Sequence, residues 1–113
     1  MLIKGIVVEG KKQAQKIGLP TANIEITEKI EPGIYKGTTE IGGKTFLSAI
    51  YVGNYRPNML ETHLIDFSGE NLYGLNIAVE IQEKIRDDIE GLTEDELKEL
   101  IASDIVKIKT LNV

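Results

Sequence analysis

Alternation of apolar and polar residues constrains the fold of this chain more than any other feature. The clearest pattern is at residues 75–82, where Leu75, Ile77, Val79 and Ile81 alternate with residues that are polar or small. A period of two is typical of a strand with one buried face. Other runs rich in β-branched and apolar residues predict strands at residues 2–8, 34–41, 45–52 and 60–67.

Turn and cap signals separate these strands and predict one helix. Gly42-Gly43 fits a two-residue hairpin turn of the primed type. Thr93 and Glu96 form a capping-box pattern, which is typical of a helix start. The apolar residues that follow lie on one helical stripe: Leu97, Leu100 and Ile101. The pattern of residues 106–113 assigns them to no element. Five or six short strands followed by one helix predict a mainly β fold, a closed antiparallel barrel or a sandwich.

Composition excludes several classes of function. With 113 residues, 42% of them hydrophobic, the chain is expected to form a single domain over residues 1–113. The absence of Cys excludes disulfides, thiolate zinc sites and Cys nucleophiles. A net charge of −5 argues against a nucleic-acid partner, and no apolar run approaches the about 20 residues of a membrane span. A cytoplasmic protein with neither nucleic-acid nor membrane partners is therefore expected.

Thr21 and Asn23 are the first candidates for a chemical role. Pro20 disfavours a helical conformation for the residue before it, so the chain is expected to be extended here. An extended chain points residues two apart to one side, where a hydroxyl and an amide oxygen suit Mg²⁺. The polar loop from Gly10 to Gly18 could present backbone N–H groups to phosphate. The alternative is a polar turn whose side chains bond to their own backbone.

Glu61, Arg86 and Tyr73 are further candidates, each with a structural alternative. Glu61 lies within an apolar strand, where it could be a general base or a solvated or ion-paired residue. His63, on the same face, is interpreted as a hydrogen-bonded strand residue rather than a catalyst. Arg86 suits a clamp on an anionic group or an ion pair with one of the two acidic residues that follow it. Tyr73 could stack on a ring or simply end a turn.

Five short motifs, spread over most of the chain, are informative together. The most specific is Gly-Leu-Pro-Thr-Ala-Asn at residues 18–23. The others are Pro32-Gly33-Ile34-Tyr35, Met59-Leu60-Glu61-Thr62-His63, Leu72-Tyr73-Gly74 and Ile85-Arg86, followed by a closing helix with Asp104. In this order, from about residue 3 to residue 104, they resemble riboflavin kinases (flavokinases) of the bacterial and eukaryotic type. The resemblance implies a six-stranded antiparallel Greek-key barrel with a C-terminal helix.

The resemblance also implies a reaction and a set of site residues. The chain would transfer the γ-phosphate of ATP to the ribityl 5′-hydroxyl of riboflavin, giving FMN and ADP. Thr21 and Asn23 would hold Mg²⁺ or another divalent metal, and Glu61 would accept the proton of the attacking hydroxyl. Nucleotide or flavin binding would also involve Gly10, Lys16, Gly18, Pro20, Tyr73 and Arg86. Riboflavin and ATP would be the small-molecule partners of a monomer.

The chain departs from the family's pattern in three places, one of which is a shorter loop between Gly53 and Glu61. Ala14 and Gln15 stand where the family's phosphate loop has a glycine and a cation, and Gly91 stands near the place of an aromatic residue. A flavin- or nucleotide-binding barrel without turnover is therefore the alternative function, and a small barrel for protein interaction is a third. In many bacteria this domain is joined to an adenylyltransferase domain. Because 113 residues leave no room for one, FAD synthesis is not expected.

Overall fold

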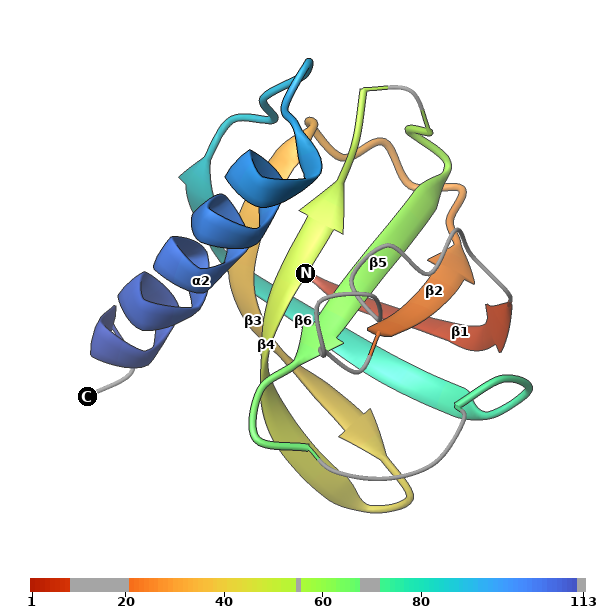
Figure 1. Cartoon of the computed structure of the whole chain (residues 1–113). Coiled ribbons are helices and arrows are strands. Elements are labelled where there is room, and N and C mark those ends of the chain that lie inside the picture. The colour runs from red at the N-terminus through yellow and green to blue at the C-terminus, as the bar shows by residue number, and fades with distance from the viewer. Residues whose placement is uncertain (9–20, 55, 68–71, 112–113) are drawn as a thin grey trace.

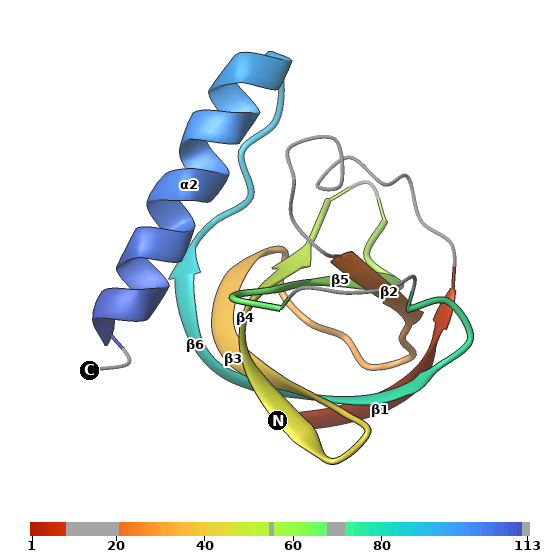
Figure 2. The same ribbon diagram turned by 60° about the horizontal axis from the view of Figure 1, so that its bottom comes forward.

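Six antiparallel strands form a closed barrel, and one helix packs on its outside (Figure 1). The computed structural model describes residues 1–8, 21–54, 56–67 and 72–111. The elements are β1 (Leu2–Val8), β2 (Thr21–Glu25), β3 (Gly33–Ile41), β4 (Lys44–Val52), β5 (Met59–Leu64), β6 (Asn76–Arg86) and α2 (Glu94–Leu111). Figure 2 shows the strands as a ring with α2 outside it. None of the described helices is long and apolar enough to cross a bilayer.

The strand order around the barrel is β1-β2-β5-β4-β3-β6. The hairpin-connected strands β3, β4 and β5 lie side by side, and β6 returns to lie beside β3, which is the Greek-key arrangement. The predicted Greek-key barrel is therefore confirmed, and the sandwich is not formed. Gly42 and Gly43, with φ of 57° and 83°, make the primed hairpin turn between β3 and β4.

Two strand boundaries differ by more than one residue from those predicted. The predicted strand 60–67 ends at Leu64, because the chain turns at Asp66, which has a φ of 60°. The strand predicted at 75–82 continues to Arg86. Two register shifts between β3 and β6 interrupt the alternation there. β6 has one extra residue opposite the step from Ile34 to Tyr35 of β3, and another opposite the step from Lys36 to Gly37.

Alternate residues of each strand fill the barrel. Ile24, Ile50, Leu60 and Val79 are completely buried in this core. Three buried hydroxyl groups also point inward: Thr39 Oγ1 lies 2.8 Å from Ser48 Oγ and 2.7 Å from Thr62 Oγ1. Each hydroxyl thus has a partner, as buried polar groups require. The remaining residues of β2, β4 and β5 face outward, and this outer face carries the candidate site.

The helix α2 starts and docks as its sequence indicates. Thr93 and Glu96 form the predicted capping box, with the Thr93 amide bonded to Glu96 Oε1 at 3.0 Å and the Glu96 amide bonded to Thr93 Oγ1 at 3.2 Å. Ile108 is buried against Ala49 and Ile65 on the outer face of the barrel. The helix continues to Leu111, so most of the segment that the sequence left unassigned is helical.

Gly37 is the glycine on which the barrel depends most. A Cβ at this position would lie 2.1 Å from the Glu80 carbonyl oxygen and 2.5 Å from Ile50 Cδ1. We expect Gly37→Ala to lower the free energy of unfolding by about 3 kcal/mol, because backbone cannot move aside as a side chain can. Urea unfolding measures this. Gly5→Ala is the control, since its Cβ would meet only the Ile24 side chain, at 3.2 Å. Equal losses in both variants would contradict the explanation.

Candidate functional site

A row of outward-facing residues crosses five neighbouring strands at one end of the barrel. Asn23 of β2 is the register partner of Glu61 of β5, which is in turn the partner of Tyr51 of β4. Tyr51 pairs with Ile34 of β3, and Ile34 pairs with Arg86 of β6. Register partners point to the same face of a sheet. The row therefore brings Asn23 and Glu61, far apart in sequence, next to each other.

Thr21 and His63 form the next pair along the same two strands. They are register partners, and Thr21 Oγ1 lies 3.2 Å from His63 Nδ1. Both residues are buried, with 8% and 5% of their surface exposed. Burial lowers the pKa of His63 to about 4, so the imidazole is neutral near pH 7. The structure confirms that Glu61 and His63 share a face.

Asn23 has a buried side-chain oxygen for which the described residues offer no hydrogen-bond partner. Its Oδ1 atom has no hydrogen-bond partner among the described residues, although the side chain is buried. A buried acceptor left without a donor is costly, and a bound cation is one way to satisfy it. Thr21 lies two residues away on the same side of β2, so a hydroxyl oxygen and an amide oxygen face one region. Hard oxygen ligands of this type suit Mg²⁺. In the described part of the chain, no three His, Cys, Asp or Glu residues cluster as a metal site.

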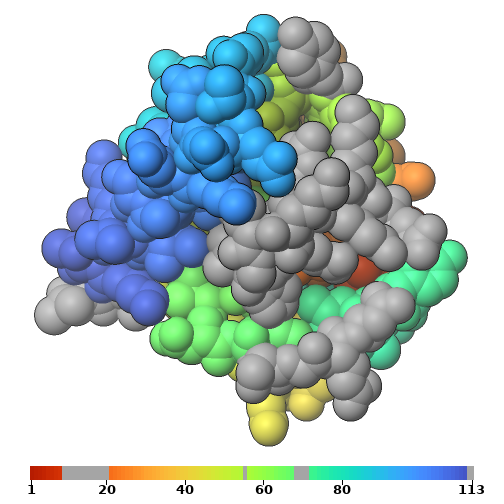
Figure 3. Space-filling model, in the orientation of Figure 1, coloured from red at the N-terminus to blue at the C-terminus, as the bar shows by residue number. Residues whose placement is uncertain are grey.

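A cleft lies between this face of the barrel and α2. It holds about 590 Å³ of space, part of it open to solvent. Figure 3 shows this side of the molecule, with α2 along one flank of the barrel. Apolar residues line it from both sides: Ile34 and Ala49 from the barrel, and Ile89, Leu92, Leu97, Leu100 and Ile101 from α2 and the segment before it. The polar residues that line it are Tyr51, Glu61, His63, Arg86, Asp88 and Asp104. A flat apolar molecule with polar substituents matches this lining.

Asp88 ties the segment after β6 to the loop after β4. Its carboxylate accepts hydrogen bonds from the Tyr51 hydroxyl at 2.9 Å, from the Asn54 backbone amide at 2.9 Å and from the Asn54 side-chain amide at 3.1 Å. Burial, together with the bond to this carboxylate, raises the pKa of Tyr51 well above its ordinary value. Gly53 makes room for the contact, since a Cβ there would lie 2.7 Å from the Tyr51 hydroxyl. These bonds hold one rim of the cleft.

Arg86 is bonded to the helix rather than to its acidic neighbours' carboxylates. Its Nε and Nη2 atoms donate to the two oxygens of Asp104, both at 2.9 Å. Its Nη1 atom donates to the backbone oxygen of Asp87. The alternative predicted from sequence, an ion pair of Arg86 with Asp87 or Asp88, is therefore wrong, because the carboxylate partner is Asp104. The bidentate pair with Asp104 holds α2 beside the cleft.

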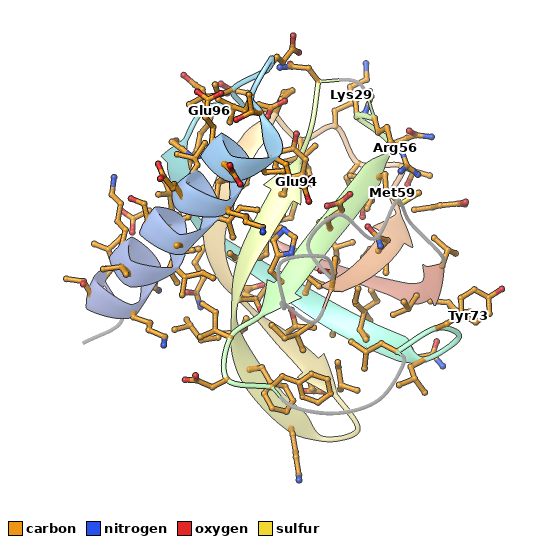
Figure 4. All side chains as sticks on the ribbon, viewed as in Figure 1. Lys29, Arg56, Met59, Tyr73, Glu94 and Glu96 are labelled. Carbon is orange, nitrogen blue, oxygen red and sulfur yellow. The ribbon has the colours of Figure 1, made fainter. Side chains whose placement is uncertain are left out.

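The remaining predicted residues are not brought to the cleft by the described structure. Gly10, Lys16, Gly18 and Pro20, like the whole loop predicted to cover phosphates, lie outside the described residues. Tyr73 is 58% exposed and lies on the side of the barrel away from α2 (Figure 4). Its turn is bonded to the end of β1, where the Gly74 amide donates to the Val7 carbonyl oxygen.

Tyr51, Asp88 and Asp104 are the site residues that reasoning from single residues missed. Asp104 was recognised only as part of the closing helix. Tyr51 had a usable signal, because it alternates with the inward-facing Ile50 and Val52 and so must face outward. No local signal joins Asp104 to Arg86, which are 18 residues apart on different elements.

Comparison with known proteins assigns the chain to a family. A family model described as riboflavin kinase matches residues 1–112. The chain belongs to the riboflavin kinase family. A bifunctional riboflavin kinase/FMN adenylyltransferase from Haemophilus influenzae is 36% identical over 116 residues, covering 95% of this chain and 37% of that protein. Its Bacillus subtilis counterpart is 32% identical over 114 residues, covering 90% of this chain and 35% of that protein. This flavokinase chain thus spans little more than a third of these relatives.

Solved structures share the flavokinase barrel. A riboflavin kinase from Trypanosoma brucei matches with a TM-score of 0.72 and 18% identity, covering 97% of this chain and 75% of that one. A protein described as a macrolide-efflux protein from Streptococcus pneumoniae matches with a TM-score of 0.79 and 24% identity, covering 96% of this chain and 36% of that one. At these identities the matches show the fold, and they confirm the barrel with its C-terminal helix.

The Arg86–Asp104 pair predicts a stability effect. Asp104→Ala should lower the free energy of unfolding by about 3 kcal/mol, because it leaves the mostly buried guanidinium without its carboxylate. Denaturant unfolding followed by circular dichroism measures the loss. Lys109→Ala, on the same helix, is the matched control. Its exposed contact with Asp66 is 3.7 Å long and should contribute less than about 0.5 kcal/mol. Similar losses in the two variants would show that the pair does not anchor the helix.

Proposed function

We propose that this chain transfers the γ-phosphate of ATP to the ribityl 5′-hydroxyl of riboflavin, giving FMN and ADP, with Mg²⁺ or another divalent metal. The observation that carries the proposal is the pairing of Asn23 with Glu61 beside Thr21 on one face of the barrel. Family membership supports the choice of substrates. We further propose that the protein acts as a cytoplasmic monomer, in keeping with its acidic charge and lack of Cys.

The proposed metal ligands are Thr21 Oγ1 and Asn23 Oδ1. The support for this choice is the buried Oδ1 atom of Asn23, which has no hydrogen-bond partner in the described part of the chain. A bound divalent ion would neutralise charge on the nucleotide phosphates, which is the main requirement of phosphoryl transfer. The loop from Gly10 to Gly18, with Lys16 and Pro20, is proposed to cover those phosphates. Tyr73 is proposed to lie near the nucleotide.

Glu61 is proposed as the general base. As the 5′-oxygen of riboflavin forms its bond to the γ-phosphorus, the bond from that phosphorus to the bridging oxygen of ATP breaks and leaves ADP. The hydroxyl proton passes to the Glu61 carboxylate. Glu61 suits this role because it lines the cleft and is only partly buried, next to the proposed metal ligand Asn23. General-base catalysis of this kind contributes roughly 10²–10⁴ in rate.

The cleft between the barrel and α2 is proposed to bind the flavin. Its apolar lining, with Ile34 from the barrel and Leu97 and Ile101 from α2, would contact the faces of the isoalloxazine ring. Arg86 is proposed to contribute to flavin binding from the β6 side of the cleft, with its guanidinium oriented by Asp104. Riboflavin would then enter with its ribityl chain toward Glu61.

Replacement of Glu61 tests the proposal most directly. Glu61→Gln should lower the rate of FMN formation by roughly 10²–10⁴, because the amide cannot accept the proton. Chromatographic separation of flavins after incubation with riboflavin, ATP and Mg²⁺ measures the product. Glu25→Gln, an exposed change at the far end of β2, is the control. Flavin binding without any FMN in the wild type would instead favour a binding barrel without turnover.

Replacement of Asn23 tests the metal ligands. Asn23→Ala should weaken binding of ADP in the presence of Mg²⁺ by about 10-fold or more, while binding of ADP in EDTA changes little. Isothermal titration calorimetry measures both affinities. Urea unfolding of the variant checks that the barrel is intact. A variant that binds Mg²⁺ and ADP like the wild type would show that Asn23 is not a ligand.

A further inference from the structure

One rim of the cleft is held by a carboxylate to which the proposed reaction assigns no role. Asp88 lies in the segment that joins β6 to α2, and its partners Tyr51 and Asn54 lie at the end of β4 and just beyond it. Its Oδ1 atom accepts the hydrogen bond from the Tyr51 hydroxyl, and its Oδ2 atom accepts those from both nitrogens of Asn54. We call these three residues the rim clasp, because their bonds join two separate segments across the edge of the cleft.

Tyr51 is the member of the rim clasp that stands between the two ends of the cleft. On the outer face of the barrel its register partners are Glu61 on one side and Ile34 on the other. The half-buried ring lines the cleft, and its hydroxyl end is bonded to Asp88. It also lies against Gly53, where a Cβ would be 2.7 Å from the hydroxyl oxygen and 3.0 Å from Cζ. The ring is therefore held both by its strand and at its tip.

We propose that Asp88 is a positioning residue for riboflavin: through the rim clasp it holds the Tyr51 ring, and the segment that carries Ile89, in the places where they contact the flavin. The inference rests on the proposed function in that it takes this cleft as the flavin site. It adds Tyr51 as a contact of riboflavin at the junction of the isoalloxazine ring and the ribityl chain, since Tyr51 lies between the apolar lining and the proposed base.

The segment that carries Asp88 needs such a tie because packing holds it weakly. Ile89 lines the cleft but is 49% exposed. Hydrogen bonds to a carboxylate are among the stronger ones, and three of them converge on Asp88. A rim that is ordered beforehand spares the ligand the cost of ordering it, whereas a loose rim weakens binding.

The geometry predicts that riboflavin gains from the clasp and that the nucleotide does not. The proposed metal ligand Asn23 lies on the other side of Glu61 from Tyr51, on β2. The clasp is thus separated from the proposed nucleotide end by a whole strand. Its loss should raise the KM for riboflavin and change kcat little, which a general loss of structure would not do.

Asp87 provides a matched control for Asp88. It carries the same charge one residue away, but its carboxylate is bonded to Lys84 at 2.7 Å and its side chain is 84% exposed. It is not among the described residues that line the cleft. Replacing either aspartate by alanine removes one negative charge from the same segment, and only Asp88→Ala opens the clasp.

Riboflavin binding, followed by the change in flavin fluorescence, is the main measurement. We expect Asp88→Ala to weaken it by about 10-fold, and Asp87→Ala by less than about twofold. Binding of ADP with Mg²⁺, measured by calorimetry, should change by less than about twofold in both variants. In steady-state assays the loss in Asp88→Ala should appear in the KM for riboflavin, with kcat within about threefold of the wild type.

Two conservative variants separate the parts of the clasp. Tyr51→Phe keeps the ring and loses one bond, so riboflavin binding should weaken by about threefold. Asp88→Asn keeps one acceptor oxygen, so its loss should lie between those of the wild type and Asp88→Ala. In the variant with both Tyr51→Phe and Asp88→Ala, the loss should be smaller than the product of the two single losses, because both remove the same bond.

The clasp can also be observed without riboflavin. The backbone amide of Asn54, an exposed residue, donates to Asp88 Oδ2 at 2.9 Å. Its hydrogen exchange should therefore be slow in the wild type and in Asp87→Ala, and fast in Asp88→Ala. Fast exchange of this amide in the wild type would show that the clasp is not closed in solution, and would overturn the proposal.

The remaining outcomes also decide. Unchanged riboflavin binding in Asp88→Ala would overturn the proposal, as would equal losses for riboflavin and ADP or equal losses in the two alanine variants. Urea unfolding shows whether each variant is folded, and if Asp88→Ala is not, Asp88→Asn and Tyr51→Phe give the answer. A wild-type chain that binds no riboflavin would remove the proposed function as well, whereas normal wild-type binding with unaffected variants would remove this inference alone.

Discussion

The pairing of β2 with β5 is the interaction on which the site depends. It places Thr21 opposite His63 and Asn23 opposite Glu61. A slip of one residue would reverse the faces, because side chains alternate along a strand. Thr21 and Asn23 would then face the side of the sheet opposite to Glu61. The apolar residues between them, Ala22 and Ile24, prevent this by requiring burial inside the barrel.

The helix completes what the barrel alone cannot provide. The outer face of β4 and β5 carries polar site residues, and Ala49 of β4 and Ile65, which directly follows β5, are apolar residues that need cover. Docking of α2 through Ile108 covers the latter, and the Arg86–Asp104 pair fixes the helix next to the cleft. The same helix therefore stabilises the barrel and forms one wall of the proposed flavin site.

Much of the fold followed from the sequence, and the exceptions have physical causes. Period-two patterns and the Gly42-Gly43 turn were sufficient for five of the six strands, since these signals are local, whereas for β2 the sequence indicated only an extended chain. The end of β5 was missed because it depends on a left-handed backbone at Asp66, which its sequence does not announce. In the site, the shared side of Thr21 and Asn23 was predictable from spacing. Their proximity to Glu61 was not, because register between strands distant in sequence is a property of the whole barrel.

The hydroxyl cluster inside the barrel has a consequence for the surface. Thr62, which bonds to Thr39, lies between Glu61 and His63 on β5. Because neighbouring residues of a strand point in opposite directions, the bond inside resists any twisting of β5 about its own axis. The orientations of Glu61 and of the His63 imidazole are thus anchored from the interior. A change among these three hydroxyls would alter the outer surface of β5 without touching any residue of the proposed site.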